Sequence, residues 1–297
     1  MKLERPVQIL VRRRAAIGDV IMSTGVVREL KKQYGDNAEI HVATEFMEVY
    51  RNNPHIASIY HTDHMPELSK FDLFINLDDA YELNPTQHYV DNYFYRTFGT
   101  LEYDRSVELF PDANDRTVVE QDLKEIGDKF IVVHMRQWYW AAKNIELKIW
   151  FDVFEKLFTQ TIDFKIVCVG GATDFAVKEH ELFVDLTGKY NSQQLKYLMD
   201  RARCFVGIDS GPFQCAAASS THIVALLTHL HPDRILPYRN GIKGYKCTAI
   251  QTDIDCRGCN DKQQRPVRQL NCVHGDFRCS KEFDADKIAS VILDQLK

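Results

Sequence analysis

The segment over residues 7–35 constrains the fold of this chain more than any other part of its sequence. It has a mostly apolar stretch at residues 7–11, then a short turn that contains Gly18, then an amphipathic pattern that ends at Gly35. These features predict a buried strand, a glycine turn and a helix. The turn places one carboxylate, Asp19, at the start of the helix. Because ligands of open α/β sheets gather beyond the carboxyl ends of the strands, Asp19 is placed to meet a substrate.

Predicted strands alternate with helices through both halves of the chain. In the first half, strands are expected at residues 7–11, 39–43, 56–60 and 71–77. The pattern begins again in the second half, with strands expected at residues 130–134, 164–169, 184–186, 204–208 and 222–227. Such alternation indicates βαβ units and parallel sheets. Two successive α/β halves predict two facing doubly wound domains with a cleft between them.

The domain limits follow from the same pattern. We expect one domain over residues 1–125 and a second over residues 126–283, with an acidic crossing between them at residues 113–127. Residues 284–297 carry an apolar stripe at helical spacing. This last segment is expected to form a helix that packs back toward the N-terminal domain.

Composition places the chain among soluble globular proteins. Hydrophobic residues make up 45% of its 297 residues and charged residues 27%. No apolar run reaches the ~18 residues that a membrane-spanning helix needs, and the first residues lack the pattern of a secretory signal. We therefore expect a cytoplasmic protein, with attachment to the periphery of the inner membrane as the alternative.

Charge is divided unevenly between the halves. Residues 1–125 hold 14 Lys and Arg against 22 Asp and Glu, a net charge of −8, whereas residues 126–297 hold 23 against 20, a net charge of +3. An acidic first half disfavours a polyanion lying along it. The consecutive Arg12, Arg13 and Arg14 are the local exception.

Two glycine-containing turns follow predicted strands of the second half. Asp209, Ser210, Gly211 and Pro212 follow a buried strand and open a helix, where backbone N–H groups and the helix dipole favour anions. The pair Gly170 and Gly171 ends another strand. Together the turns predict a bound nucleoside diphosphate, although an Asp or Ser helix cap explains the first turn equally well. The GxxxxGK[ST] and GxGxxG motifs are absent, which disfavours a kinase or a dinucleotide-dependent dehydrogenase.

Several side chains are candidates for chemistry at this cleft. Asp19 could accept a hydroxyl proton as that oxygen attacks, and Lys143 could balance the charge of a phosphate leaving group. Arg136 and Trp138 are candidates for gripping a base or a sugar. The simpler interpretations are a helix cap for Asp19 and a solvated loop residue for Lys143.

Four cysteines near the C-terminal end have the spacing of a metal site. They are Cys256, Cys259, Cys272 and Cys279, a CxxC pair followed by two further thiols. Four thiolates suit either zinc or iron, and a site without an open position would be structural. Free thiols and disulfides are the alternatives, of which disulfides are disfavoured in a reducing compartment.

Five segments follow one another along the chain in this order: ILVRRRAAIGDVIMSTGVVRELKKQYG, FDLFINL, VGGATD, DLTGKYNSQQLKYLMDRARCFVGIDSGPFQCAAA and HIVALL. Together they resemble family 9 glycosyltransferases, the heptosyltransferase family. The resemblance implies a GT-B architecture: two facing Rossmann-like domains with parallel sheets and an interdomain cleft. It implies that the C-terminal domain binds a sugar nucleotide, that the N-terminal domain binds the acceptor, and that the anomeric centre is inverted without a catalytic metal ion or other cofactor.

The resemblance also implies roles for individual residues. Asp19, after Gly18, matches the family's acidic residue that is taken as the general base, and Lys143 matches its phosphate-contacting lysine. Asp209, Ser210 and Gly211 match its donor-binding turn. The four cysteines resemble those of family members that modify autotransporter proteins and carry iron.

The function predicted from the sequence is therefore transfer of a sugar from a nucleoside diphosphate to a hydroxyl, with inversion. The acceptor is open between a lipopolysaccharide core, a protein and a hydroxylated DNA base. Two rival functions are a sugar-nucleotide epimerase and a non-catalytic, nucleotide-binding homo-oligomer fastened by the metal.

Overall fold

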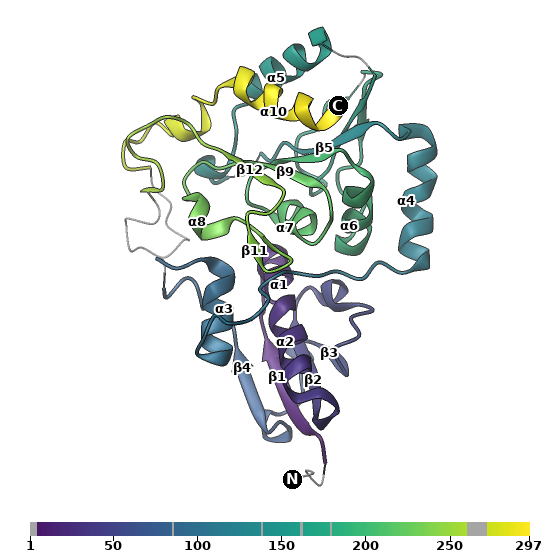
Figure 1. Cartoon of the computed structure of the whole chain (residues 1–297), viewed down its shortest axis with the longest axis vertical. Helices are drawn as coiled ribbons and strands as arrows, with labels where there is room; N and C mark the ends of the chain where they lie inside the picture. The colour runs from purple at the N-terminus through teal and green to yellow at the C-terminus, as the bar shows by residue number, and fades with distance from the viewer. Residues whose placement is uncertain (1–4, 85, 138, 161–162, 179, 260–271) are drawn as a thin grey trace.

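The structure of the protein is a computed structural model that describes residues 5–84, 86–137, 139–160, 163–178, 180–259 and 272–297. It has two α/β halves, a narrower one that holds the N-terminus and a broader one that holds the C-terminus (Figure 1). Each half is built on its own parallel sheet, and helices from both halves meet between the sheets. This arrangement confirms the predicted GT-B fold class.

The N-terminal sheet has four parallel strands in the order β3-β2-β1-β4. Its members are β1 (Val7–Arg12), β2 (Ala38–Thr44), β3 (Ser58–His61) and β4 (Leu73–Asn76). The central strand β1 is apolar because both of its faces are covered: Ile9, Leu10 and Val11 are fully buried.

The C-terminal sheet has six parallel strands in the order β12-β9-β8-β5-β6-β7. They are β5 (Phe130–His134), β6 (Lys165–Cys168), β7 (Phe183–Asp185), β8 (Cys204–Gly207), β9 (His222–Leu226) and β12 (Cys247–Ile250). The edge strand β12 was not predicted from the sequence. It follows a short hairpin of β10 (Tyr238–Arg239) and β11 (Ile242–Lys243), and it places the half-buried Cys247 beside Ile223.

The first helix of the chain is broken, where the sequence predicts one continuous helix. It divides into α1 (Ile17–Met22) and α2 (Thr24–Tyr34) at Ser23. The Ser23 hydroxyl lies 2.7 Å from the Val20 carbonyl oxygen and 2.7 Å from the Tyr50 hydroxyl. A serine that bonds to the backbone of the preceding turn bends a helix, and here the bend turns α1 toward the other half.

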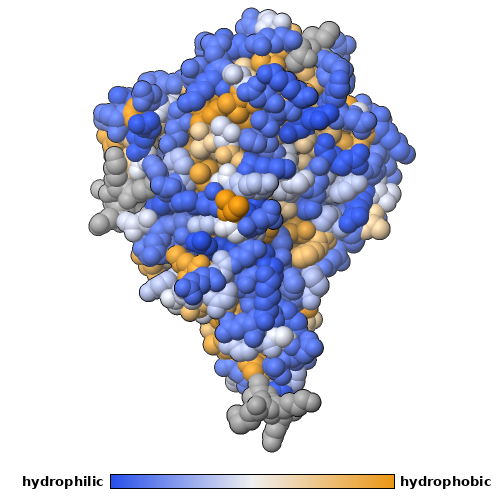
Figure 2. Space-filling view, viewed as in Figure 1, coloured by the Kyte–Doolittle hydropathy of each residue, from blue (hydrophilic) through white to orange (hydrophobic). Residues whose placement is uncertain are grey.

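Further α-helices are α3 (Tyr89–Phe98), α4 (Ala113–Ile126), α5 (Leu147–Gln160), α6 (Ser192–Arg201), α7 (Gly211–Ala217), α8 (Pro232–Ile235) and α10 (Ala285–Leu296). Short 3-10 turns include η2 (Met47–Tyr50) and η5 (Ala141–Lys143). No helix among the described residues combines the length and the apolar character needed to cross a bilayer. The face of the molecule in Figure 2 is mostly hydrophilic, with apolar residues in scattered patches.

Two connections differ from the sequence predictions. The acidic segment that was expected to cross between domains is the helix α4, which packs against α6 of the C-terminal half. The helix α10 does not pack back toward the N-terminal half, as predicted, but against α5 and β9. Ile288 and Ile292 of α10 are fully buried beside Trp150 and Val224, so its apolar stripe belongs to the core of its own half.

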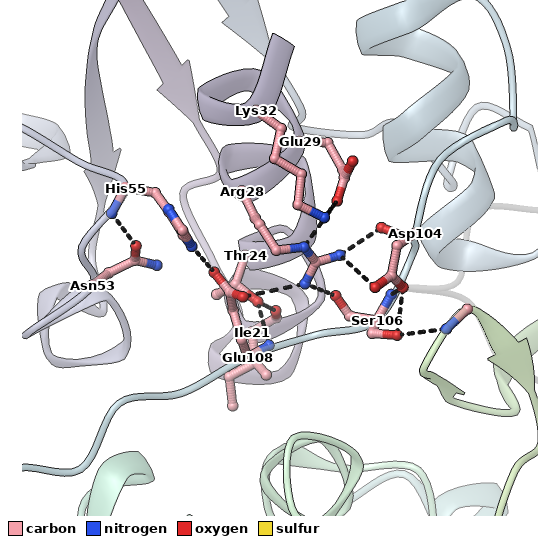
Figure 3. Close-up of polar contacts among 11 residues, drawn as sticks. Ile21, Thr24, Arg28, Glu29, Lys32, Asn53, His55, Asp104, Ser106 and Glu108 are labelled. Carbon is pink, nitrogen blue, oxygen red and sulfur yellow. Dashed lines mark hydrogen bonds and ion pairs between the residues drawn. The ribbon is translucent and has the colours of Figure 1, made fainter. Parts of the chain in front are cut away.

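The segment that leads from α3 to α4 is held against α2 by a polar network (Figure 3). The Arg28 guanidinium donates to the Ser106 carbonyl at 2.8 Å and to the Glu108 carboxylate at 3.2 Å. The Glu108 N–H donates to the Thr24 hydroxyl at 3.0 Å, and the Ser106 hydroxyl accepts from the Gly241 N–H of the C-terminal half. This network fixes the segment between α3 and α4 (residues 99–112), called the crossing segment below, to both halves.

Candidate active site between the two halves

A cavity of about 340 Å³ lies between the halves, where α1 faces α7. A volume of this size suits part of a small ligand. Its N-terminal side is lined by Arg13, Ala15, Ala16, Ile17, Gly18, Asp19, Met22, Tyr81, Glu82 and Tyr89, and its C-terminal side by Arg136, Trp140, Lys143, Asp209, Ser210, Gly211 and Gln214. The structure therefore brings together Gly18, Asp19, Arg136, Lys143, Asp209, Ser210 and Gly211, all of which the sequence analysis singled out.

Asp19 is held from several directions at the start of α1. Its two carboxylate oxygens accept from the Ala16 N–H at 2.8 Å and from the Tyr81 hydroxyl at 2.9 Å. The Arg13 guanidinium forms an ion pair with the Asp19 carboxylate at 2.9 Å. The side chain keeps 17% of its surface exposed, toward the cavity that it lines. Asp19 is thus oriented by its neighbours and still accessible to a ligand.

Arg13 is the buried cation of this side of the cavity. Only 3% of the residue is exposed, and its guanidinium also contacts the Glu82 carboxylate at 3.1 Å and lies 5.2 Å from the centre of the Tyr81 ring. Burial alone would lower the pKa of Arg13, but the acidic groups around it, including Tyr93 and Asp19, raise that pKa above its usual value. Arg13 therefore stays charged and holds two carboxylates in place.

The C-terminal side of the cavity carries two cations. The Lys143 ammonium lies 3.4 Å from the Asp209 carboxylate and 5.8 Å from the centre of the Trp140 ring. Burial lowers the pKa of Arg136, and Asp174 and Asp209 oppose that effect. Ser210 is the N-cap of α7, and its hydroxyl accepts from the Phe213 N–H at 3.4 Å. Cations beside the first N–H groups of a helix are suited to a diphosphate.

Gly170 and Gly171 do not line this cavity. The Gly171 N–H donates to the Asp174 carboxylate at 2.7 Å, and a Cβ on Gly170 would lie 2.5 Å from a carboxylate oxygen of Asp174. The two glycines thus contact Asp174, which does not line the cavity. That they bind a nucleotide stays a prediction. Trp138, the other candidate for gripping a ligand, lies outside the described residues.

Sequence reasoning missed Arg13, Tyr81, Glu82 and Gln214. Gln214 is 3% exposed, and its amide nitrogen has no hydrogen-bond partner among the described residues; the same holds for one carboxylate oxygen of Glu82. Tyr81 and Glu82 follow β4, so the rule that ligands gather beyond the carboxyl ends of parallel strands could have identified them. Nothing local distinguishes Arg13 from its neighbours Arg12 and Arg14.

None of the four cysteines lines the cavity, but the turn η7 (Arg278–Ser280), which holds Cys279, packs against η5, which carries the cavity residue Lys143. Among the described residues none of the four forms a disulfide, and Cys279 is the most buried of them. Burial, together with the neighbouring thiols of Cys259, Cys272 and Cys256, raises the pKa of Cys279 to about 12, so the four thiols lie in one neighbourhood. A tighter group of potential ligands joins Asp255, Cys256 and His274, whose donor atoms lie within 4.8 Å of one another. Residues 260–271, between the second and third cysteines, lie outside the described part of the chain.

Comparison with protein families decides the class to which this site belongs. The model of glycosyltransferase family 9 (heptosyltransferase) matches residues 69–265, well over half of the chain. This chain belongs to glycosyltransferase family 9. It is therefore a glycosyltransferase, and its cavity lies between the two sheets of a GT-B enzyme. A search of curated proteins gave no match.

Solved structures support the fold of this family 9 glycosyltransferase at low sequence identity. A family 9 glycosyltransferase from Veillonella parvula is 14% identical with a TM-score of 0.72, over 100% of this chain and 99% of that one. The iron-containing dodecameric glycosyltransferase TibC from enterotoxigenic E. coli is 14% identical with a TM-score of 0.72, over 100% of this chain and 80% of TibC. The E. coli ADP-heptose lipopolysaccharide heptosyltransferase II is 15% identical with a TM-score of 0.68, over 98% of this chain and 100% of that one.

Proposed function

We propose that this glycosyltransferase moves a heptose-like sugar from a nucleoside diphosphate to an acceptor hydroxyl, with inversion of the anomeric centre. Family membership supports the reaction class. The choice of sugar is supported by related structures, since TibC has been solved with ADP-D-β-D-heptose and the E. coli heptosyltransferase WaaC with ADP-2-deoxy-2-fluoro heptose.

One observation carries the mechanism: Asp19 and the turn at Ser210 and Gly211 line the same cavity from opposite halves. In the proposed reaction, Asp19 takes the proton of the acceptor hydroxyl while that oxygen attacks the anomeric carbon. The bond from that carbon to the diphosphate oxygen breaks on the opposite face, which inverts the centre. Lys143 and the Gly211 N–H stabilise the negative charge that develops on the departing diphosphate.

The neighbours of Asp19 have a supporting role in this mechanism. Arg13 and Tyr81 together contact both carboxylate oxygens, so the base is held in one orientation before the acceptor arrives. Such preorganisation removes part of the entropic cost of bringing base and hydroxyl together.

Replacement of the base tests the mechanism. Asp19→Asn should fold and bind ADP like the wild type, while its turnover with ADP-heptose falls by ~10²–10⁴, the usual contribution of a general base. Asp36→Asn, which changes an exposed carboxylate in the same half, serves as the control and should keep full turnover. Wild-type turnover in Asp19→Asn would refute the role of Asp19, and a product that retains the donor's anomeric configuration would refute inversion.

The acceptor is proposed to be a glycolipid or protein hydroxyl. Arg12, Arg13 and Arg14 were part of the case for a DNA acceptor. Each of these guanidinium groups is paired with a carboxylate: Arg12 with Asp78 at 2.8 Å, Arg13 with Asp19 and Glu82, and Arg14 with Glu45 at 2.6 Å. Neutralised cations give no support to a polyanionic partner. Labelled sugar offered with a lipopolysaccharide core, a peptide or hydroxymethylated duplex DNA would distinguish the three.

We further propose that the four cysteines hold a structural zinc or iron ion. Their mutual proximity and their thiol chemistry fit such an ion, and the resemblance to TibC, whose structure contains iron, supports it. A bound metal would fasten the segment that precedes α10, with no part in sugar transfer.

A homo-oligomer, a cytoplasmic location and catalysis without a cofactor stay predictions. A donor-only assay addresses the rivals: an epimerised sugar would support the epimerase, and hydrolysis of the sugar nucleotide would count against the non-catalytic oligomer.

A further inference from the structure

A buried histidine connects the two glycine turns that the sequence analysis singled out. His134 ends β5, and its side chain is 3% exposed. One ring nitrogen, Nδ1, lies 2.9 Å from the Ser210 hydroxyl, and the other, Nε2, lies 3.0 Å from the Asp174 carboxylate. Ser210 lines the cavity, whereas Asp174 and His134 lie behind it. The three side chains form one chain of hydrogen bonds that leads from the Gly170 turn to the cavity wall.

Glycines make room for this chain of hydrogen bonds. A Cβ on Gly170, whose φ is +146°, would lie 2.5 Å from the Asp174 carboxylate and 2.9 Å from the His134 ring. A Cβ on Gly207 would lie 3.3 Å from the His134 Cβ. The Gly171 N–H fixes the Asp174 carboxylate from a further side at 2.7 Å. The absence of a Cβ at Gly170 and at Gly207 leaves room for the His134 ring. Close packing and hydrogen bonds at both ring nitrogens then hold that ring in one orientation.

The direction of each proton follows from the chemistry of the three groups. Burial opposes ionisation of Asp174, but the His134 ring, the Gly171 N–H and Arg136 together lower the pKa of that carboxyl below its usual value. Burial lowers the pKa of His134, although Asp174 opposes this effect. A neutral ring has one N–H, and a carboxylate can only accept, so the proton belongs on Nε2. Nδ1 is then the acceptor of the Ser210 O–H.

This assignment turns the Ser210 hydroxyl away from the cavity. Its hydrogen points to His134, while its oxygen accepts from the Phe213 N–H as the cap of α7. A second acceptor for that hydrogen, the Ile208 carbonyl at 3.0 Å, also lies inside the protein. The Ser210 hydroxyl therefore stabilises the conformation of the turn, and the Gly211 N–H is the group of the turn that can bind a ligand.

We propose that Asp174 and His134 are positioning residues that act through Ser210 to hold residues 209–211 in the conformation that receives the diphosphate. The inference rests on the proposed function for the identity of that ligand. It also gives Gly170 and Gly171 a role that does not require contact with the nucleotide, because Gly170 leaves room for the His134 ring and the Gly171 N–H anchors the Asp174 carboxylate.

A double-mutant cycle tests the proposal, with ADP as the probe and calorimetry as the measurement. Asp174→Asn and Ser210→Ala should each weaken ADP binding by about 5–20-fold, and the double variant should bind no more weakly than the weaker single one, since both changes interrupt one pathway. Ser210→Thr, which keeps the hydroxyl, should restore binding. Independent effects that multiply in the double variant would overturn the proposal.

The His134 ring supplies a readout that a general packing role would not change. Nitrogen NMR of the ring should show the Nε2–H tautomer in the wild type and in Ser210→Ala, and a mixture of tautomers in Asp174→Asn. An Nδ1–H tautomer in the wild type would overturn the assignment. His222→Asn is the matched control, because His222 Nε2 contacts the Thr248 hydroxyl at 2.9 Å at the amino-terminal end of the same sheet, and ADP affinity should not change.

The two proposals fail in different ways. If the wild type binds ADP and the cycle is non-additive but no acceptor receives sugar, the proposed function is wrong and the positioning role stands. If sugar is transferred while the cycle is additive, the positioning role is wrong and the proposed function stands.

Discussion

Buried histidines make the protein sensitive to mild acid. Burial lowers the pKa of His229 to about 3 and that of His88 to about 4, and it also lowers the pKa of His134. Because these values lie below those of the unfolded chain, the unfolded state binds more protons as the pH falls below about 6.5. The free energy of unfolding should therefore decrease as the pH falls below about 6.5, by up to ~1.4 kcal/mol per pH unit for each histidine.

Urea unfolding at pH 7.5, 6 and 5 measures this slope, and one variant isolates one group. His229→Gln should reduce the slope below pH 6 by about 1.4 kcal/mol per pH unit. His64→Gln, at an exposed position, should leave the slope unchanged. An unaltered slope in His229→Gln would mean that His229 is not neutral in the native state. Asp174, whose pKa is lowered, contributes in a different window, since its stabilisation is lost only as the pH falls below about 4.

At the level of residues, the sequence was sufficient to locate side chains that directly follow a predicted strand. Asp19 follows β1 and Ser210 follows β8, so each could be placed beyond the carboxyl edge of its own parallel sheet. The role of Gly170 could not, since it depends on Asp174 and His134, which approach from different elements. Likewise, the selection of Arg13 over Arg12 and Arg14 for burial depends on Tyr81 and Glu82, which arrive from a distant loop.

Among elements, the contact of α2 with the crossing segment sets a limit on substitution. An alanine normally stabilises a helix by ~1 kcal/mol relative to glycine. At Gly25, however, a Cβ would lie 2.6 Å from the Ser106 carbonyl oxygen and 3.4 Å from the Phe94 ring. The Ser106 carbonyl is itself held by Arg28, so it cannot easily move away.

We therefore predict that Gly25→Ala lowers the free energy of unfolding by about 1–3 kcal/mol, the usual cost of overpacking. Chemical denaturation at pH 7.5 measures the effect. Gln33→Ala, at an exposed position of the same helix, should change stability by less than ~0.5 kcal/mol. A Gly25→Ala variant that is more stable than the wild type would show that the crossing segment can shift.

The elements that the sequence predicted least well are those whose packing partner lies far along the chain. The apolar stripe of α10 showed that one face is buried but could not show that α5 and β9 cover it. The strand β12 is short and contains both polar and apolar residues, so its sequence does not predict a strand. Its pairing with β9 stabilises the extended conformation. The break at Ser23 required Tyr50, which arrives from η2.

For the whole molecule, the cysteine segment predicts a dependence on metal. The purified protein should contain about one zinc or iron per chain by elemental analysis. Cys279→Ser should lose most of that metal and ~2 kcal/mol of stability, or roughly 5 °C in melting temperature. His274→Ala should retain the metal if the four thiolates are the ligands. Metal that is lost in His274→Ala but kept in Cys279→Ser would instead identify the group of Asp255, Cys256 and His274.

Because α10 stays with its own half, the described chain passes between the two sheets at one place, shortly before α4. A break in the backbone near Asp112 would leave each fragment with every strand of its own sheet. Side-chain bonds such as those from Gln193 to the Glu48 and Val49 carbonyls would still draw the fragments together. The enzyme is thus suited to expression as two complementing polypeptides, in which recovered sugar transfer would report their reassembly.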